Sequence, residues 1–258
     1  MSSILVESIS RGLVSVTLNR PERRNALNIS MMQQLVESLK DLAGDKSTRV
    51  VILKGAGPVF CAGLDLAEAQ DAQLVRQSAA LVAQTLKSLK FGPLVTIAAV
   101  HGGAYAGGGG VVAACDMAIG TDDCKIGFPE ARRGLLPALI CDVLKTKVRE
   151  GDLAELFLVG EPISAARAQQ VGILQRVVTA DALMDVAIQM AENILAGGPQ
   201  TIIDTKHLLH QAYGHLGNEH DEEHAGSSID EHLKARFSEE AAEGLKAFTE
   251  KRLPSWMM

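Results

Sequence analysis

Aromatic residues are scarce in this sequence of 258 residues. Phe, Tyr and Trp together make up 3% of the chain, so it offers few stacking platforms for single-stranded nucleic acid. Positive charge is also sparse, because no Lys/Arg run exceeds two residues and the formal net charge is −6. A nucleic-acid-binding or membrane-surface protein is expected to carry a basic face. We therefore expect neither nucleic acid nor membrane among the partners.

Long apolar runs and cysteine motifs are missing as well. The longest apolar stretches are too short to span a bilayer, and the first residues, MSSILVESISRG, do not have the pattern of a secretory signal. The four cysteines fit no zinc or CxxC spacing, which predicts buried free thiols in a reducing compartment; they are Cys61, Cys115, Cys124 and Cys141. These absences predict a soluble, cytoplasmic protein.

What the chain does contain is a regular alternation of strand-like and helix-like segments. Hydrophobic residues make up 47% of the sequence, enough for a sizeable core. Residues 4–18 predict a hairpin that turns at Arg11-Gly12. Further strands are predicted near 49–54, 94–100, 117–120, 125–128 and 174–178. Helices are predicted near 30–44, 68–90, 108–115, 137–147, 150–158, 164–170 and through most of 180–250. This order predicts an α/β core followed by a helical region.

Two strand-to-helix junctions share one form. They read VVILKGAGPVFCAGLDLAEA and LVTIAAVHGGAYAGGGGVVAACD. In each, a buried strand leads into a loop of Gly and Ala, and a helix begins just beyond with unpaired backbone N–H groups. Two such starts facing each other could hold one oxygen as an oxyanion hole. Glycine-rich turns of this kind are common and most are explained by tight packing, so either loop alone is weak evidence for a site. Neither loop has the G-x-G-x-x-G spacing of a dinucleotide site.

Six sequence blocks occur in a recognisable order. They are NRPERRNALN, FCAGLDL, VHGGAYAGGGGVVAACD, GFPEARRGLLP, FLVGEPISAARAQQVGILQRVV and EGLKAFTEKRLPSW. From about Val14 to Trp256, the chain resembles the crotonase family, the enoyl-CoA hydratases and isomerases. The resemblance implies an α/β fold, with a crotonase-like spiral of ββα units over 1–190 and a helical C-terminal region for subunit packing over 191–258. It also implies an acyl-CoA thioester substrate, no metal, no cofactor beyond the substrate's own CoA, and a homotrimer or a hexamer built as a dimer of trimers.

The resemblance further implies roles for individual residues. The thioester oxygen is expected between the backbone N–H groups of Ala62 and Gly107, with the glycine run leaving bare backbone for the thioester and its pantetheine arm. Glu130 is expected to be the catalytic carboxylate. The residues expected to contact substrate or CoA are Arg24, Ala26, Leu27, Asp65, Leu66, Gly108, Phe248 and Lys251, the last two reaching the CoA of a neighbouring subunit. Asp65 is equally well explained as an acid favouring a helix start, and Lys251 as a solvated charge.

The sequence departs from the best-known hydratases at one carboxylate. Those enzymes carry a glutamate three residues after the oxyanion glycine, and here that position is Gly110. A single carboxylate can move a proton from C2 to C4, which is double-bond isomerisation, or activate a water for addition across the C2–C3 bond. The blocks around Gly110 and Glu130 resemble the methylglutaconyl-CoA hydratase-like branch, which favours hydration. The alternatives are an isomerase and a catalytically idle acyl-CoA-binding protein.

Three remaining features have simple interpretations. Tyr105 is either a second polar group at the site or a packing residue, and Asp116 is expected to be structural. His220 and His224 lie four residues apart in a polar segment, a spacing that can ligate a metal. We expect no metal there, since the chemistry implied by the resemblance needs none.

Overall fold

The computed structural model describes residues 2–69, 71, 73–212 and 238–258. Its strands are β1 (Ile4–Ser10), β2 (Leu13–Leu18), β3 (Val50–Gly55), β4 (Val95–Val100), β5 (Gly103–Tyr105), β6 (Met117–Thr121), β7 (Lys125–Gly127), β8 (Ile163–Ser164) and β9 (Arg176–Val178). Its longer helices are α1 (Ile29–Gly44), α3 (Val75–Phe91), α4 (Gly107–Ala114), α5 (Ala138–Leu144), α8 (Leu183–Leu195), α9 (Pro199–Ala212) and α11 (Glu239–Glu250). Its shorter helical turns are α2 (Leu66–Ala69), α6 (Glu150–Ala154), α7 (Ala165–Gln170), η1 (Pro21–Arg23), η2 (Ala131–Arg133), η3 (Glu155–Val159) and η4 (Ser255–Met257).

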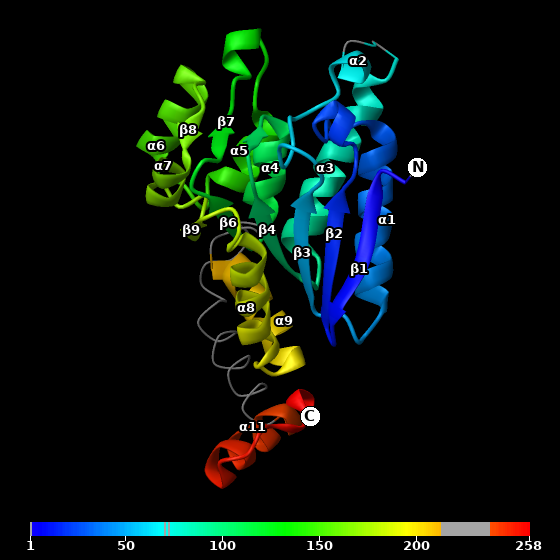
Figure 1. The fold of residues 1–258 in the computed structure, drawn as a ribbon, viewed down its shortest axis with the longest axis vertical. Helices are drawn as coiled ribbons and strands as arrows, with labels where there is room; N and C mark the ends of the chain where they lie inside the picture. Colours follow the sequence, from blue (N-terminus) through cyan, green and yellow to red (C-terminus); the bar gives the residue numbers. More distant parts are fainter. Residues whose placement is uncertain (1, 70, 72, 213–237) are drawn as a thin grey trace, which may run out of the picture. The chain divides into compact units, whose positions relative to one another are not determined.

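The chain divides into two compact units, Met1–Ala191 and Glu192–Met258. The first unit contains both sheets, and Figure 1 shows its helices α1 and α3 behind the strands of the larger one. None of the helices in the described part of the chain is both long and apolar enough to cross a membrane.

The larger sheet has six strands in the order β1-β2-β3-β4-β6-β9. The hairpin β1–β2 is antiparallel, and every other pair is parallel. Strands β2 and β4 are buried along their whole length, as expected for parallel strands covered on both faces. One face carries alternate residues of the strands, such as Val16, Leu53 and Val100, into the main hydrophobic core.

Helices α1 and α3 pack against each other and bring their apolar faces into that core. Asn28 caps α1, since its side chain accepts a hydrogen bond from the backbone N–H of Met31 at 3.0 Å. This is the ordinary role of asparagine at a helix start, which satisfies one of the otherwise unpaired N–H groups. Leu35 and Leu89 are fully buried between the two helices and the sheet.

A second, smaller sheet has the order β5-β7-β8. Strands β5 and β7 run parallel, with Tyr105 opposite Gly127, and β8 pairs antiparallel with β7. Helix α4 begins directly after β5, and the segment that carries Glu130 follows β7. The carboxyl ends of two parallel strands therefore bring these two segments to the same edge, where ligands of parallel sheets usually bind.

The second unit is held together by contacts of its own. Glu240 of α11 accepts hydrogen bonds from the backbone N–H groups of Gln200 and Thr201, at 2.9 and 2.7 Å, and so caps the start of α9. The indole N–H of Trp256 donates to the carbonyl oxygen of Ala196 at 3.0 Å. The described helices of this unit fall within the region that the sequence predicts to be helical.

Candidate active site

Four backbone segments of the first unit lie side by side at the edge of the small sheet. Leu27 forms a parallel bridge with Leu64, Cys61 forms one with Ala104, and Ala104 in turn lies opposite Ile126 of β7. Leu64 and Gly107 each lie three residues beyond the matched pair Cys61 and Ala104. The two glycine-containing loops therefore run side by side, with Leu64 and Gly107 at corresponding positions.

The first predicted oxyanion donor requires a correction. The N–H of Ala62 donates to the carbonyl oxygen of Arg24 at 3.0 Å, so it is already paired inside the protein. The peptide unit between Gly63 and Leu64 is oriented differently. The carbonyl oxygen of Gly63 accepts from the N–H of Leu27 at 2.7 Å, and in a trans peptide the C=O and the following N–H point in opposite directions. The N–H of Leu64 therefore points away from Leu27, and in the described part of the chain it meets no acceptor.

The N–H of Gly107, the second donor that the family resemblance implies, stays a candidate. Gly107 is the first residue of α4, and the preceding carbonyl, that of Ala106, accepts from Gly110 at 3.0 Å. The N–H of Gly107 shares a peptide unit with that carbonyl and so points out of the helix start. A Cβ on Gly63 would lie 3.6 Å from the nitrogen of Gly107, and a Cβ on Gly107 would lie 3.7 Å from Cγ of Leu64. The two unpaired N–H groups thus belong to neighbouring positions.

The rest of the glycine run packs against protein. A Cβ on Gly108 would lie 2.5 Å from the carbonyl oxygen of Cys61, and one on Gly109 would lie 2.6 Å from the ring of Phe128. On this face the loop of Cys61 occupies the space beside Gly108, and contact of Gly108 with substrate or CoA stays a prediction. A Cβ on Gly110 would lie 3.1 Å from Ile140 and 3.6 Å from Leu86. The place of the missing glutamate is thus lined by apolar side chains.

These spacings predict different effects on folding stability for two neighbouring alanine variants. Gly108→Ala should destabilise the fold by about 1–3 kcal/mol, since its Cβ would overlap the rigid backbone of Cys61. Gly107→Ala should stay within about 1 kcal/mol of wild type, because its Cβ has ordinary contact distances of 3.5–3.9 Å. Urea unfolding of both variants checks this. Equal stabilities would show that Gly108 is not required by packing.

Glu130 is a buried carboxylate with an unpaired oxygen. Its exposed fraction is 7%, and its Oε2 atom has no hydrogen-bond partner among the described residues. Burial raises the pKa of Glu130 above its ordinary value, against the lowering effects of its own backbone N–H and of Arg133. Arg132 is occupied elsewhere, donating to the carbonyl oxygen of Val159 at 2.8 Å and pairing with Glu161. A buried carboxylate with a raised pKa can act as a base and return the proton as an acid.

Known proteins resemble this chain over nearly its whole length. The profile of the enoyl-CoA hydratase/isomerase family matches residues 8–258. The chain belongs to this family, the crotonases. A putative enoyl-CoA hydratase from Thermus thermophilus is 32% identical, covering 95% of this chain and 98% of the relative. The 2,3-dehydroadipyl-CoA hydratase of Escherichia coli is 30% identical, covering 99% of both chains. The crystal structure of an enoyl-CoA hydratase from Mycobacterium smegmatis has a TM-score of 0.91 and 31% identity, and covers 99% of both chains.

The shared fold confirms the predicted architecture. An α/β crotonase fold with two sheets and C-terminal helices is what the sequence predicts in outline. Crotonases bind acyl-CoA, so the two N–H groups and Glu130 are candidates for the contacts with a thioester. The sequence-based choice of Ala62 is two peptide units away from the unpaired N–H of Leu64.

A buried amide that the sequence analysis missed organises the first loop of this crotonase. Asn25 is 0% exposed and adopts a left-handed conformation with φ of 54°. Its Nδ2 atom donates to the carbonyl oxygens of Ala56, Val59 and Phe60 at 2.8–3.1 Å. The only sequence signal is an asparagine directly after the Arg-Arg pair, since asparagine tolerates positive φ better than most residues.

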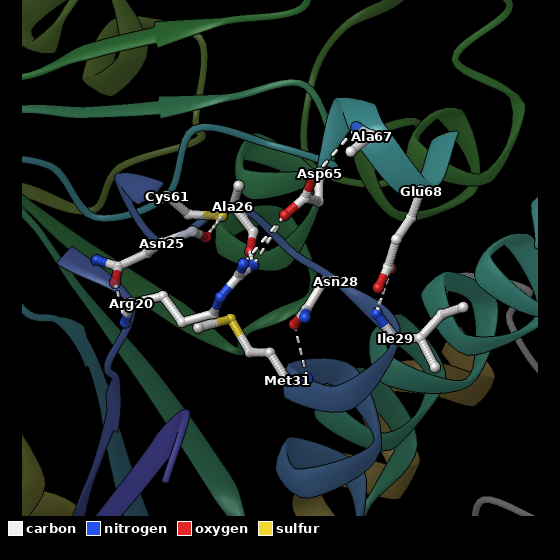
Figure 2. A network of polar contacts seen from close by, with 10 residues as sticks. All are labelled: Arg20, Asn25, Ala26, Asn28, Ile29, Met31, Cys61, Asp65, Ala67 and Glu68. Carbon is white, nitrogen blue, oxygen red and sulfur yellow. Dashed lines mark hydrogen bonds and ion pairs between the residues drawn. The ribbon is translucent and has the colours of Figure 1, made fainter. Parts of the chain in front are cut away.

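The other residues predicted to bind CoA have varied settings in the first unit. Leu27 is buried, Ala26 is half-buried, and Arg24 and Leu66 are exposed. Asp65 is ion-paired with Arg20 at 3.1 Å, and its Oδ1 accepts from the N–H of Ala67 at 3.2 Å, as Figure 2 shows. These contacts support the plainer interpretation of Asp65 as an acid at a helix start.

Tyr105 and Asp116 have roles in packing and loop structure. A Cβ on Gly103 would lie 2.5 Å from the ring of Tyr105, so this ring folds back over its own strand. Asp116 accepts from the backbone N–H and the hydroxyl of Thr96, at 2.8 and 3.0 Å, and so ties β4 to the end of α4. The structural role expected for Asp116 agrees with these contacts.

The last two predicted CoA contacts belong to the second unit. Phe248 is 84% exposed on α11, and Lys251 is exposed and ends that helix in a left-handed conformation. Their contact with the CoA of a neighbouring subunit stays a prediction. Within the described residues, no three His, Cys, Asp or Glu side chains gather as metal ligands. His220 and His224 lie outside the described residues.

Proposed function

We propose that this crotonase is an enoyl-CoA hydratase that adds water across the 2,3 double bond of an acyl thioester. The observation that carries the proposal is the buried carboxylate of Glu130, whose Oε2 atom has no hydrogen-bond partner among the described residues. Glu130 follows β7 at the sheet edge where the unpaired N–H groups of Leu64 and Gly107 also lie. These two donors would hold the thioester oxygen, where negative charge collects as the enolate forms.

The single carboxylate would serve both proton steps. Glu130 takes a proton from a water molecule, whose oxygen forms the new bond to C3, while the electron pair of the double bond moves toward the thioester oxygen. The protonated Glu130 then donates that proton to C2 as the thioester carbonyl re-forms. Both atoms of hydrogen and the oxygen of one water are accounted for, and addition takes place on one face of the double bond.

Isomerisation is the second candidate, and Gly110 favours it. Position 110 is a glycine whose surroundings are the apolar side chains of Ile140 and Leu86, whereas the best-known hydratases have a second acid there. Glu130 alone could take a proton from C2 of a 3-enoyl thioester and return it to C4. The names of the relatives from Thermus thermophilus and Escherichia coli favour hydration.

An assay with isotopically labelled water tests these candidates. The intact protein is offered 2-enoyl- and 3-enoyl-CoA substrates with short, long, branched and carboxylate-ended acyl groups, including a methylglutaconyl type. A hydratase should remove the absorbance of the conjugated 2-enoyl thioester and place ¹⁸O from water at C3. Gain of that absorbance from a 3-enoyl thioester, with no ¹⁸O in the product, would replace hydration by isomerisation. If no substrate is turned over, the remaining interpretation is a catalytically idle acyl-CoA-binding protein.

We also propose that the active form is a homotrimer or a hexamer. Several large apolar side chains of the second unit are exposed, which supports packing against other copies; they are Leu208, Leu209, Leu245, Phe248 and Leu253. Sedimentation of the protein at assay concentration measures this, and a monomer at full activity would contradict it.

A further inference from the structure

Arg20 lies where two segments of the candidate site meet. Its Nη1 atom donates to the carbonyl oxygen of Ala26 at 2.6 Å, and Nη1 and Nη2 both contact Oδ2 of Asp65 at 3.1 Å. Figure 2 shows the contacts of the guanidinium with both acceptors. The side chains of Arg20 and Asp65 are only 16% and 18% exposed. The pair is therefore shielded from water, which makes its hydrogen bonds stronger than those of an exposed ion pair.

The contacts of Asp65 bear directly on its neighbour Leu64. The N–H of Asp65 donates to the carbonyl oxygen of Leu27 at 2.9 Å, and its side chain is held by Arg20 and by the N–H of Ala67. On the other side of Leu64, the carbonyl oxygen of Gly63 is held by the N–H of Leu27. The peptide that presents the N–H of Leu64 is thus fixed on both sides.

Gly63 makes this fixation necessary. It adopts φ of 98°, a conformation open mainly to glycine. A glycine has low barriers to other conformations, so the direction of the following N–H depends on contacts made further along the chain. Arg20 supplies such contacts on both segments. It donates hydrogen bonds to Ala26, which precedes Leu27, and to Asp65, which follows Leu64.

We propose that Arg20 is a positioning residue of the oxyanion hole, which holds the N–H of Leu64 in line with that of Gly107 by clamping Asp65 to the segment of Ala26. This inference rests on the proposed function of the two N–H groups. Arg20 acts through Asp65 and the backbone, and its guanidinium is occupied by these protein acceptors. Its loss should therefore affect the transition state, where the donors bear most of the developing charge, more than substrate binding.

Kinetics of Arg20 variants test the clamp. Arg20→Met should lower kcat about 10-fold or more with KM changed less than about twofold, since small displacements of catalytic groups are costly. Arg20→Lys keeps one cationic donor and should recover part of the loss, and Asp65→Asn should lose less than Arg20→Met. Arg167→Met is the matched control, because Arg167 pairs with Asp152 and Glu155 on another part of the first unit. Unchanged kcat in a folded Arg20→Met variant, or a raised KM alone, would overturn the proposal.

A second measurement needs no turnover. Acetoacetyl-CoA forms an enolate with its own ultraviolet absorbance, and bound to the wild type its C2–H should be more acidic than in water. Arg20→Met should raise the pKa of this bound ligand toward its value in water, whereas Arg167→Met should not. Equal titrations of the wild type and Arg20→Met would overturn the clamp. Failure of the wild type to hydrate any enoyl-CoA would instead overturn the proposed function, so the two failures are distinguishable.

Discussion

Turnover should fall by about 10²–10⁴-fold when Glu130 is replaced by glutamine, since that is the usual contribution of a positioned general acid and base. Glutamine keeps nearly the same shape but can neither take the proton of the water nor return it to C2. The side chain is buried, so its replacement by an isostere should leave the packing intact. Initial rates with the best 2-enoyl-CoA, before and after the substitution, give the ratio.

The same variant should be more stable than wild type at neutral pH. The pKa of Glu130 lies above its ordinary value of 4.5 because of burial. Between these two pKa values the folded chain binds more protons than the unfolded chain, so folding stability falls as the pH rises through this window. Glutamine has no charge to bury. Its advantage in Tm should be largest above the folded-state pKa of Glu130 and should shrink as the pH falls toward 4.5.

Glu161→Gln is the control for both measurements. Glu161 is an exposed carboxylate, 65% exposed in its side chain, and it pairs with Arg132 at 2.8 Å. Its loss should leave turnover unchanged and should not raise Tm at neutral pH. If Glu130→Gln retains turnover within about twofold of wild type, Glu130 is not the acid–base group. If it also lowers Tm, the carboxylate is a structural group after all.

The central strands β2, β3 and β4 of the larger sheet could be predicted because each one is a distinct, mostly apolar run. The segments at 4–18, 49–54 and 94–100 are strands within one or two residues of their predicted bounds. The helix predicted over 68–90 is described instead as α2 (Leu66–Ala69) and α3 (Val75–Phe91). Its apolar periodicity resides in α3, which buries Leu81, Leu86 and Leu89.

The small sheet was not predicted, although it carries the site. Strand β5 has three residues and lies inside a glycine-rich loop, and β8 has two. Strands of this length are too short to show alternation, and their pairing depends on segments far apart in the sequence. The prediction treated β7 as one more strand of the core, whereas it is the centre of a separate sheet.

The error at Ala62 has a related cause. The sequence identifies the loop that contains a donor, but the direction of each N–H depends on pairing with the segment 24–27. The left-handed conformations of Arg24 and Asn25 bring that segment beside the loop. For a similar reason the sequence does not tell which glycines of the run pack against protein and which face a ligand. The contacts of the run with Cys61, Phe128 and Ile140 come from three other parts of the chain.

Removing the N–H of Gly107 should cost about 10²–10³-fold in kcat, the usual effect of losing one oxyanion donor. Gly107 is the first residue of α4, and proline is well tolerated at the first position of a helix because the N–H there has no helical partner. Gly107→Pro therefore deletes one hydrogen-bond donor while leaving the hydrogen bonds of α4 in place. Ala106 before it has φ of 49° and ψ of −122°, away from the extended conformation that a residue before proline prefers, so circular dichroism and Tm of Gly107→Pro are measured before its kinetics.

Gly107→Ala separates the missing donor from the added bulk. Its Cβ would lie 3.5 Å from Leu27 and 3.7 Å from Leu64, distances of ordinary contact, and it keeps the N–H. The ratio of kcat between Gly107→Ala and Gly107→Pro then isolates the contribution of the hydrogen bond. Because this donor acts mainly on the enolate, KM should differ little between the two variants. Equal kcat values in two folded variants would mean that the N–H of Gly107 does not hold the thioester oxygen. The proposed oxyanion hole of Leu64 and Gly107, and with it the proposed role of Arg20, would then be wrong.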